Sequence, residues 1–143
     1  MRRFTAEYLT TTREGMWADS REALSALGLP SRQRVLDVGA GTGALTAVLR
    51  EETPGTVVAL DADRSLLGSV PDVPRVCGDA NRLPFPDDTF DLVVCQALLV
   101  NLPDPAAAVR ELARVSAAAV AAVEPNNAAV TIESTVDGEA ALA

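Results

Sequence analysis

One stretch, residues 35–45 with the sequence VLDVGAGTGAL, constrains the fold of this chain more than any other. An apolar, β-branched segment leads through Asp37 into glycines at every second position, 39, 41 and 43. Because glycine has no Cβ, such a turn lets the backbone approach another group closely. The apolar run is typical of a strand buried on both faces, and apolar residues recur at helical spacing from Leu45 onward. The stretch predicts a strand, a glycine turn and a helix.

The rest of the chain alternates between strand and helix patterns. Further strands are expected at 55–61, 73–79, 90–96 and 117–125, and helices at 11–27, 62–70 and 105–116. The alanine-rich stretch at 117–125 also fits a continuation of the preceding helix. The pattern predicts an α/β fold, a Rossmann-like parallel sheet with helices on both faces and a ligand site beyond the carboxyl ends of its strands. We expect one domain over 1–143: a helical segment at 1–30, a core at 33–124 and a short tail at 125–143.

Composition excludes several functions. The net charge is −8 and the pI is about 4.4, so a nucleic-acid partner, which requires a basic surface, is not expected. Histidine is absent, so no imidazole serves as base or metal ligand, and we expect no metal. Cys77 and Cys95 are expected to be buried, reduced thiols. No apolar run is long enough for a signal peptide or a membrane span, which predicts no membrane partner and a cytoplasmic location.

The glycine turn alone leaves two kinds of cofactor open. Gly39, Gly41, Ala44 and Asp61 satisfy the dinucleotide-binding pattern of a strand, G-x-G-x-x-A, a helix and an acid about 20 residues later. Asp37 argues against it, because a carboxylate beside the turn repels a pyrophosphate and attracts an ammonium group. The third glycine lies at 43 rather than 44, and a proline-rich loop with an acidic turn follows the third strand. These features favour a cofactor that carries no phosphate.

Four segments in this order, VLDVGAGTG, ALDAD, GDANRLPFPDDTFDLVV and AVRELARV, resemble the successive motifs of class I S-adenosylmethionine-dependent methyltransferases. The resemblance covers roughly residues 33–124. It implies that the chain binds S-adenosyl-L-methionine and transfers its methyl group to an acceptor, which we expect to be a small molecule. Because this cofactor is cationic at its ammonium and sulfonium groups, nearby carboxylates suit it.

The resemblance also implies a role for each site residue. Asp37 and the Gly39 carbonyl would meet the methionine ammonium, and Asp61 would accept hydrogen bonds from the ribose hydroxyls. Asp79 would bind the adenine amino group and the Ala80 amide a ring nitrogen. The remaining expected contacts are Ala40, Gly41 and Gly43 in the turn, Ala62 beside the adenine, and Gln96 near the methionine part.

No catalytic residue can be named, because methyl transfer often needs no strong base. Tyr8, Glu14 and Glu124 are the candidates if a base is required. Tyr8 is also expected, with Arg13 and Trp17, either in an N-terminal lid over the cofactor or in ordinary helix packing and surface charge. A further expectation concerns three acids at the start of the fourth strand, which we interpret as turn formers on a solvated rim: Asp87, Asp88 and Asp91.

The sequence departs from the family at its C-terminus, where about 19 residues follow Glu124 instead of a strand hairpin. We expect an uncovered fifth strand, and therefore a homodimer through this sheet edge or a soft C-terminus. Two alternatives to an active methyltransferase stay open. One is a catalytically inactive S-adenosylmethionine-binding module, and the other is an NAD(P)-dependent oxidoreductase.

Overall fold

The computed structural model describes residues 21–70, 72–123 and 130–134, which form a six-stranded sheet in the order β3-β2-β1-β4-β5-β6. Strands β1 to β5 run parallel, and β6 pairs antiparallel with β5. The strands are β1 (Arg34–Val38), β2 (Thr56–Asp61), β3 (Arg75–Cys77), β4 (Phe90–Gln96), β5 (Ser116–Val123) and β6 (Val130–Ser134). The predicted Rossmann-like parallel sheet is confirmed.

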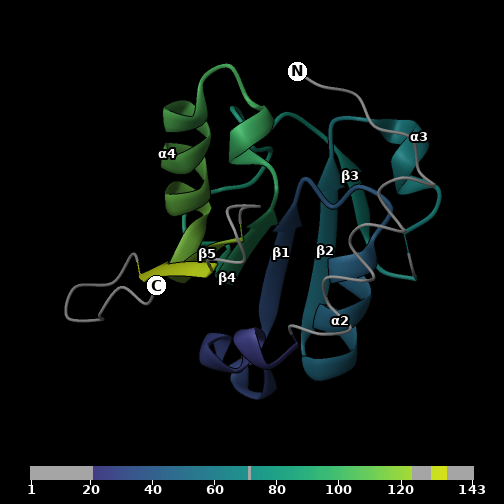
Figure 1. The fold of residues 1–143 in the computed structure, drawn as a ribbon, viewed down its shortest axis with the longest axis vertical. Coiled ribbons are helices and arrows are strands. Elements are labelled where there is room, and N and C mark those ends of the chain that lie inside the picture. Colours follow the sequence, from purple (N-terminus) through teal and green to yellow (C-terminus); the bar gives the residue numbers. More distant parts are fainter. Residues whose placement is uncertain (1–20, 71, 124–129, 135–143) are drawn as a thin grey trace.

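Helices cover both faces of this sheet (Figure 1). The helices are α2 (Ala44–Glu52), α3 (Arg64–Leu67) and α4 (Pro105–Val115), with short 3-10 helices η1 (Arg21–Leu27), η2 (Leu29–Ser31) and η3 (Leu99–Asn101). α4 begins at an Asp104 cap, whose carboxylate accepts from the Ala107 amide, with Pro105 in the first turn. Among the described residues, no helix has the length and apolar character needed to cross a membrane.

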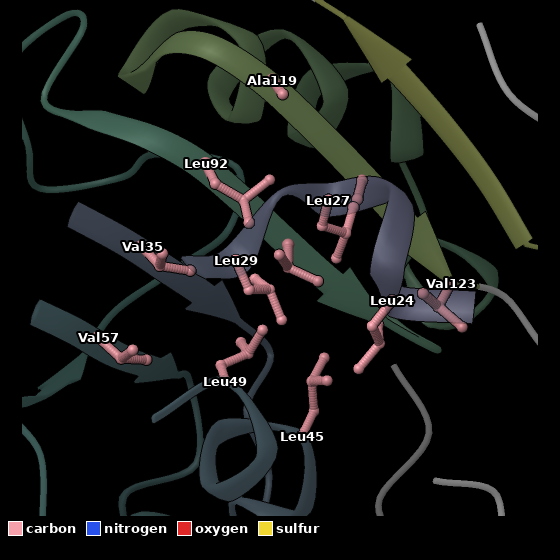
Figure 2. Close-up of a cluster of buried hydrophobic side chains, with 12 residues drawn as sticks. Leu24, Leu27, Leu29, Val35, Leu45, Leu49, Val57, Leu92, Ala119 and Val123 are labelled. Atoms are coloured by element: carbon pink, nitrogen blue, oxygen red, sulfur yellow. The ribbon is translucent and has the colours of Figure 1, made fainter. Parts of the chain in front are cut away.

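Alternate residues of the central strands belong to two different apolar cores. Val35 of β1 packs in a core with η1, η2 and α2, whereas its neighbour Leu36 packs in a second core with α4. Figure 2 shows the first core, in which leucines from η1, η2 and α2 converge on the β1–β4 face of the sheet. Period-two alternation with both faces apolar is the pattern expected of buried parallel strands.

Part of the N-terminal helix prediction is wrong. Residues 11–20 lie outside the described part of the chain, and Arg21–Leu27 forms a 3-10 helix rather than an α-helix. A 3-10 helix has three residues per turn, so Leu24 and Leu27 fall on one side, and both are buried. The apolar spacing that suggested an α-helix therefore fits the tighter helix equally well.

At the C-terminal end of the described chain, the predicted fifth strand is confirmed, but the prediction that its edge is uncovered is wrong. The alanine-rich β5 separates from α4 at Ser116 and pairs along its length with β4. Within the tail, β6 forms a strand whose backbone pairs with β5 from Val130↔Val123 to Ser134↔Ala119. The edge of β5 is therefore covered, and the homodimer, whose premise was a bare β5, stays a prediction. Residues 124–129 and 135–143 lie outside the described part.

Candidate functional site at the carboxyl edge of the sheet

The glycine turn joins the carboxyl end of β1 to α2 and is fastened to the neighbouring strand. The amides of Gly39 and Ala40 both donate to the carbonyl of Leu60 in β2, at 2.8 and 2.9 Å. The three glycines at 39, 41 and 43 have φ of 75°, 60° and 90°, in the left-handed region that side chains avoid. A Cβ on Gly39 would lie 2.9 Å from Cδ1 of Leu98. The turn therefore has its predicted place; all three glycines are required by conformation, and Gly39 also by close packing.

Asp61 is the last residue of β2, and its carboxylate is already fixed by two backbone amides. Gly41 in the glycine turn donates to Oδ2 at 2.8 Å, and Asp63 donates to Oδ1 at 2.8 Å. An ionised carboxylate offers about four acceptor positions, so each oxygen can accept one more donor. The side chain is partly exposed. Asp61 is thus oriented by the protein and still able to bind a ligand that offers two hydroxyl groups.

Asp79 follows β3 and lies close to Asp61. The Gly78 amide donates to the Asp61 carbonyl at 3.0 Å, which connects the ends of the two strands. Asp79 begins a tight turn, since its carboxylate accepts from the Asn81 amide at 2.8 Å and its carbonyl from the Arg82 amide at 3.0 Å. Asp79 is exposed, whereas Ala80 is buried. The structure therefore brings the glycine turn, Asp61 and the 79–82 turn to one edge, as predicted.

Asp37 lies differently from the other predicted acids. Its side chain is buried beneath the start of α2, where Oδ2 accepts the hydroxyl of Thr46 at 2.6 Å. This contact connects β1 to α2 across the glycine turn. A role toward a ligand ammonium stays a prediction.

The chain leaves β4 through a second conformationally unusual segment. Gln96 is buried, and Ala97 after it has φ of 52°, held by its amide donating to Val123 at 2.7 Å and its carbonyl accepting from Asn101 at 2.8 Å. This segment presents Leu98 to Gly39. No residue pattern indicates this conformation, because alanine rarely adopts a positive φ.

Two expectations about individual side chains are wrong. Cys77 is exposed rather than buried, because it ends the edge strand β3, and its Sγ lies 3.6 Å from the Ala62 carbonyl. Cys95 is buried as expected. Asp91 is not a turn former, because it lies in β4, where its carboxylate accepts the Gln33 and Arg34 amides at 2.8 and 3.1 Å. Asp88 is a turn former, with φ of 54°. Tyr8, Arg13, Glu14, Trp17 and Glu124 lie outside the described residues.

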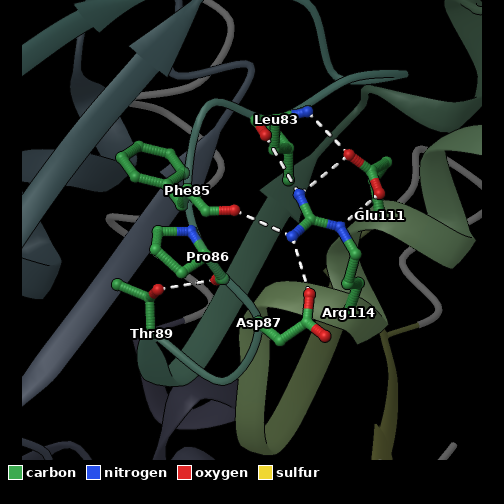
Figure 3. Close-up of polar contacts among 7 residues, drawn as sticks. All are labelled: Leu83, Phe85, Pro86, Asp87, Thr89, Glu111 and Arg114. Atoms are coloured by element: carbon green, nitrogen blue, oxygen red, sulfur yellow. Dashed lines mark hydrogen bonds and ion pairs between the residues drawn. The ribbon is translucent and has the colours of Figure 1, made fainter.

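One polar cluster was missed by the sequence reasoning. Arg114 and Glu111 on α4 contact the proline-rich loop that follows the 79–82 turn (Figure 3). The only sequence signal is an acid and an arginine three residues apart on a helix, a spacing at which side chains meet. Their main partners are backbone groups of the loop, which no residue pattern reveals.

The fold and this site define a class of protein. The model of the methyltransferase domain family matches residues 36–121, which span the glycine turn, both following acids and most of β5. The chain belongs to this family. The oxidoreductase alternative rested on Gly39, Gly41, Ala44 and Asp61, and all four lie within the matched residues.

Individual relatives narrow the comparison. The chain is 46% identical over 94 residues to a demethylmenaquinone methyltransferase of Mycolicibacterium paratuberculosis, across 64% of this chain and 40% of that protein. The chain thus spans less than half the length of this relative. A solved SAM dependent methyltransferase from Aquifex aeolicus has the same fold, with a TM-score of 0.72, 22% identity and coverage of 85% and 73%. The [4+2]-cyclase SpnF is also similar, with a TM-score of 0.65, 25% identity and coverage of 76% and 46%.

Proposed function

We propose that this chain binds S-adenosylmethionine at the carboxyl edge of β1, β2 and β3 and transfers its methyl group to a small-molecule acceptor. The observation that carries the proposal is the orientation of the Asp61 carboxylate. Its two oxygens are each oriented by one backbone amide, and each keeps room for one further donor. A ribose offers two adjacent hydroxyls, which match these two positions. The two acceptor oxygens of Asp61 therefore fit an adenosine-containing cofactor.

The other residues of the edge suit the remaining parts of this cofactor. Asp79 and the Ala80 amide would hold the adenine, and Ala62, exposed beside the end of β2, would pack near it. The glycine turn, with Ala40, Gly41 and Gly43, would lie along the cofactor backbone. Asp37 and the Gly39 carbonyl would meet the methionine ammonium, and Gln96 would lie beside the methionine part.

The protein needs only to bind and orient the reactants, because the cofactor supplies the reactive group. When bound, the cofactor supplies a methyl group already activated by its sulfonium. The chain's own residues bind and orient, which converts a bimolecular displacement into one between aligned partners. Asp61 and the glycine turn are suited to this because their backbone bonds fix them before a ligand arrives. We assign no catalytic base.

The acceptor is inferred from relatives. The similarity to a demethylmenaquinone methyltransferase supports a small-molecule acceptor and makes a demethylated quinol the first compound to test.

A titration calorimetry experiment tests cofactor binding. We expect S-adenosylmethionine and S-adenosylhomocysteine to bind, NADH not to bind, and Asp61→Ala to abolish binding of the first two. Asp61→Asn is the sharper variant, because its amide NH₂ must face one of the two backbone donors and an oxygen acceptor is lost. Asp72→Asn, at an exposed acid, is the control. A folded chain that binds neither sulfur compound, or binds them equally well without the Asp61 carboxylate, contradicts the proposal.

A second candidate function is favoured by one comparison. SpnF, a [4+2]-cyclase, has this fold, so the fold alone does not require methyl transfer. A chain that binds S-adenosylmethionine but does not transfer a radiolabelled methyl group to the quinol or to other phenolic and thiol acceptors would support a binding module. Transfer to any of them supports the enzyme.

A further inference from the structure

Arg114, in the last turn of α4, uses its whole guanidinium group to bind Glu111 on the same helix and one loop. Nε and Nη2 donate to the two oxygens of Glu111, at 2.6 and 3.0 Å. Nη2 also donates to the Leu83 carbonyl at 3.0 Å, and Nη1 to the Phe85 carbonyl and the Asp87 carboxylate, at 2.8 and 2.9 Å. Figure 3 shows the guanidinium between Glu111 and the loop. These five bonds equal the number of N–H groups that arginine has.

Glu111 completes the contact from the other side. Its Oε1 accepts the Leu83 amide at 2.8 Å, so both the amide and the carbonyl of Leu83 are held by α4 side chains. The loop is held again further on, where the Asp88 amide donates to the Arg114 carbonyl at 2.9 Å. The pair therefore fixes the orientation of both peptide groups of Leu83.

Leu83 directly follows the 79–82 turn. That turn closes through the Arg82 amide and the Asp79 carbonyl, and its other end continues from β3. The Leu83 side chain is buried in the second core together with Ala80. The turn is thus held by the sheet at one end and by Glu111 and Arg114 at the other. These two side chains bind Leu83, which is the residue directly after Arg82.

We infer that Glu111 and Arg114 are positioning residues, which set the Asp79 carboxylate and the Ala80 amide for the adenine of the cofactor. This inference rests on the proposed function. If the pair only attached α4 to the loop, substituting either residue would change stability alone. If the pair positions the turn, a substitution must also lower the affinity of the folded protein for the cofactor, because displaced donors and acceptors no longer meet the ligand.

The test uses Arg114→Lys, Arg114→Ala and Glu111→Gln. Lysine keeps the positive charge but cannot reproduce a five-bond fork. The matched control is Arg110→Lys, at an exposed arginine one turn earlier on α4. S-adenosylhomocysteine affinity is measured by calorimetry well below each melting temperature, and hydrogen exchange of the 79–83 amides is measured without ligand.

We expect Arg114→Lys and Glu111→Gln to bind about tenfold more weakly, the size of a typical coupling between sites, with faster exchange at 79–83. Arg110→Lys should match the wild type in both. If Arg114→Ala does not fold, the two milder variants decide. Melting temperatures that fall while affinity stays at the wild-type value overturn the inference. A wild-type protein that binds no S-adenosylhomocysteine instead overturns the proposed function, and the inference with it.

Discussion

Thr46 on α2 donates its hydroxyl to Asp37 on β1 over 2.6 Å, and the two side chains are 0% and 1% exposed. The residues lie on either side of the glycine turn, one at the end of the strand and one in the first turn of the helix. A buried carboxylate is costly unless donors compensate it. This hydrogen bond therefore both stabilises the acid and fixes how α2 leaves the turn.

Removing the Thr46 hydroxyl should destabilise the fold. Thr46→Val keeps the shape of the side chain and takes one donor from a buried carboxylate, at a cost of about 1.5 to 3 kcal/mol. Thr46→Ser keeps the hydroxyl and loses one methyl group, at a cost of about 1 kcal/mol. Urea unfolding measures both. Equal stability of the two variants would mean that the hydroxyl contributes little.

Gly39→Ala should destabilise the chain for two reasons. Its φ of 75° costs a residue with a Cβ on the order of 1 to 3 kcal/mol. The new Cβ would also lie 2.9 Å from Cδ1 of Leu98, a contact that the leucine can relieve only by moving. In a Leu98→Ala background the steric part disappears, so Gly39→Ala should cost less there. Thermal melts of the four proteins measure this coupling.

Gly68→Ala is the control for that substitution. Gly68 has φ of −60° at the end of α3, and its Cβ would meet the Ser65 carbonyl oxygen at an ordinary 3.5 Å. We expect no loss, or a gain of about 0.4 to 1 kcal/mol from a less flexible unfolded chain. A loss as large as that of Gly39→Ala would contradict the conformational explanation.

The parts of the fold that could be predicted are those whose physics is local in the sequence. β4 has the predicted bounds, 90–96, because a strand buried on both faces is a continuous apolar run. The glycine turn was predictable because few residues other than glycine tolerate a positive φ. The acid at the end of β2 was predictable because it directly follows an apolar run. β3 is shorter than expected, since this edge strand pairs over only three residues.

The rest depends on contacts between distant segments. Alanine favours helix, yet β5 is a strand because it pairs with β4 on one side and β6 on the other. Asp91 and Arg114 bind backbone groups that folding brings to them. The amides that Asp91 binds are 57 or more residues away in the sequence, and the loop carbonyls that Arg114 binds are 29 or more residues away. No residue pattern marks a backbone partner.

Asp91 is expected to matter for stability and not for binding. Its carboxylate accepts two amides at the start of β1, at the end of the sheet opposite to the glycine turn. Asp91→Ala should cost about 1 to 3 kcal/mol, and Asp91→Asn less, since one acceptor oxygen remains. Asp72→Ala, at an exposed acid, should cost nothing measurable. A weaker affinity of folded Asp91→Ala for S-adenosylhomocysteine would contradict this placement.

The contribution of Glu111 should depend on pH with a definite sign. The hydrogen bond from Arg114 lowers the pKa of Glu111 below its ordinary value of 4.5; burial opposes this, and the Leu83 amide and nearby arginine charges add to it. A carboxyl whose pKa is lower in the folded state stabilises that state fully above 4.5 and progressively less as the pH falls through the folded value. The wild type should therefore exceed Glu111→Gln in stability at pH 7, and the difference should shrink below pH 4.5. Urea unfolding at pH 7 and below pH 4.5, with Asp72→Asn as control, measures this difference in stability. A difference that grows on acidification would refute the lowered pKa of Glu111.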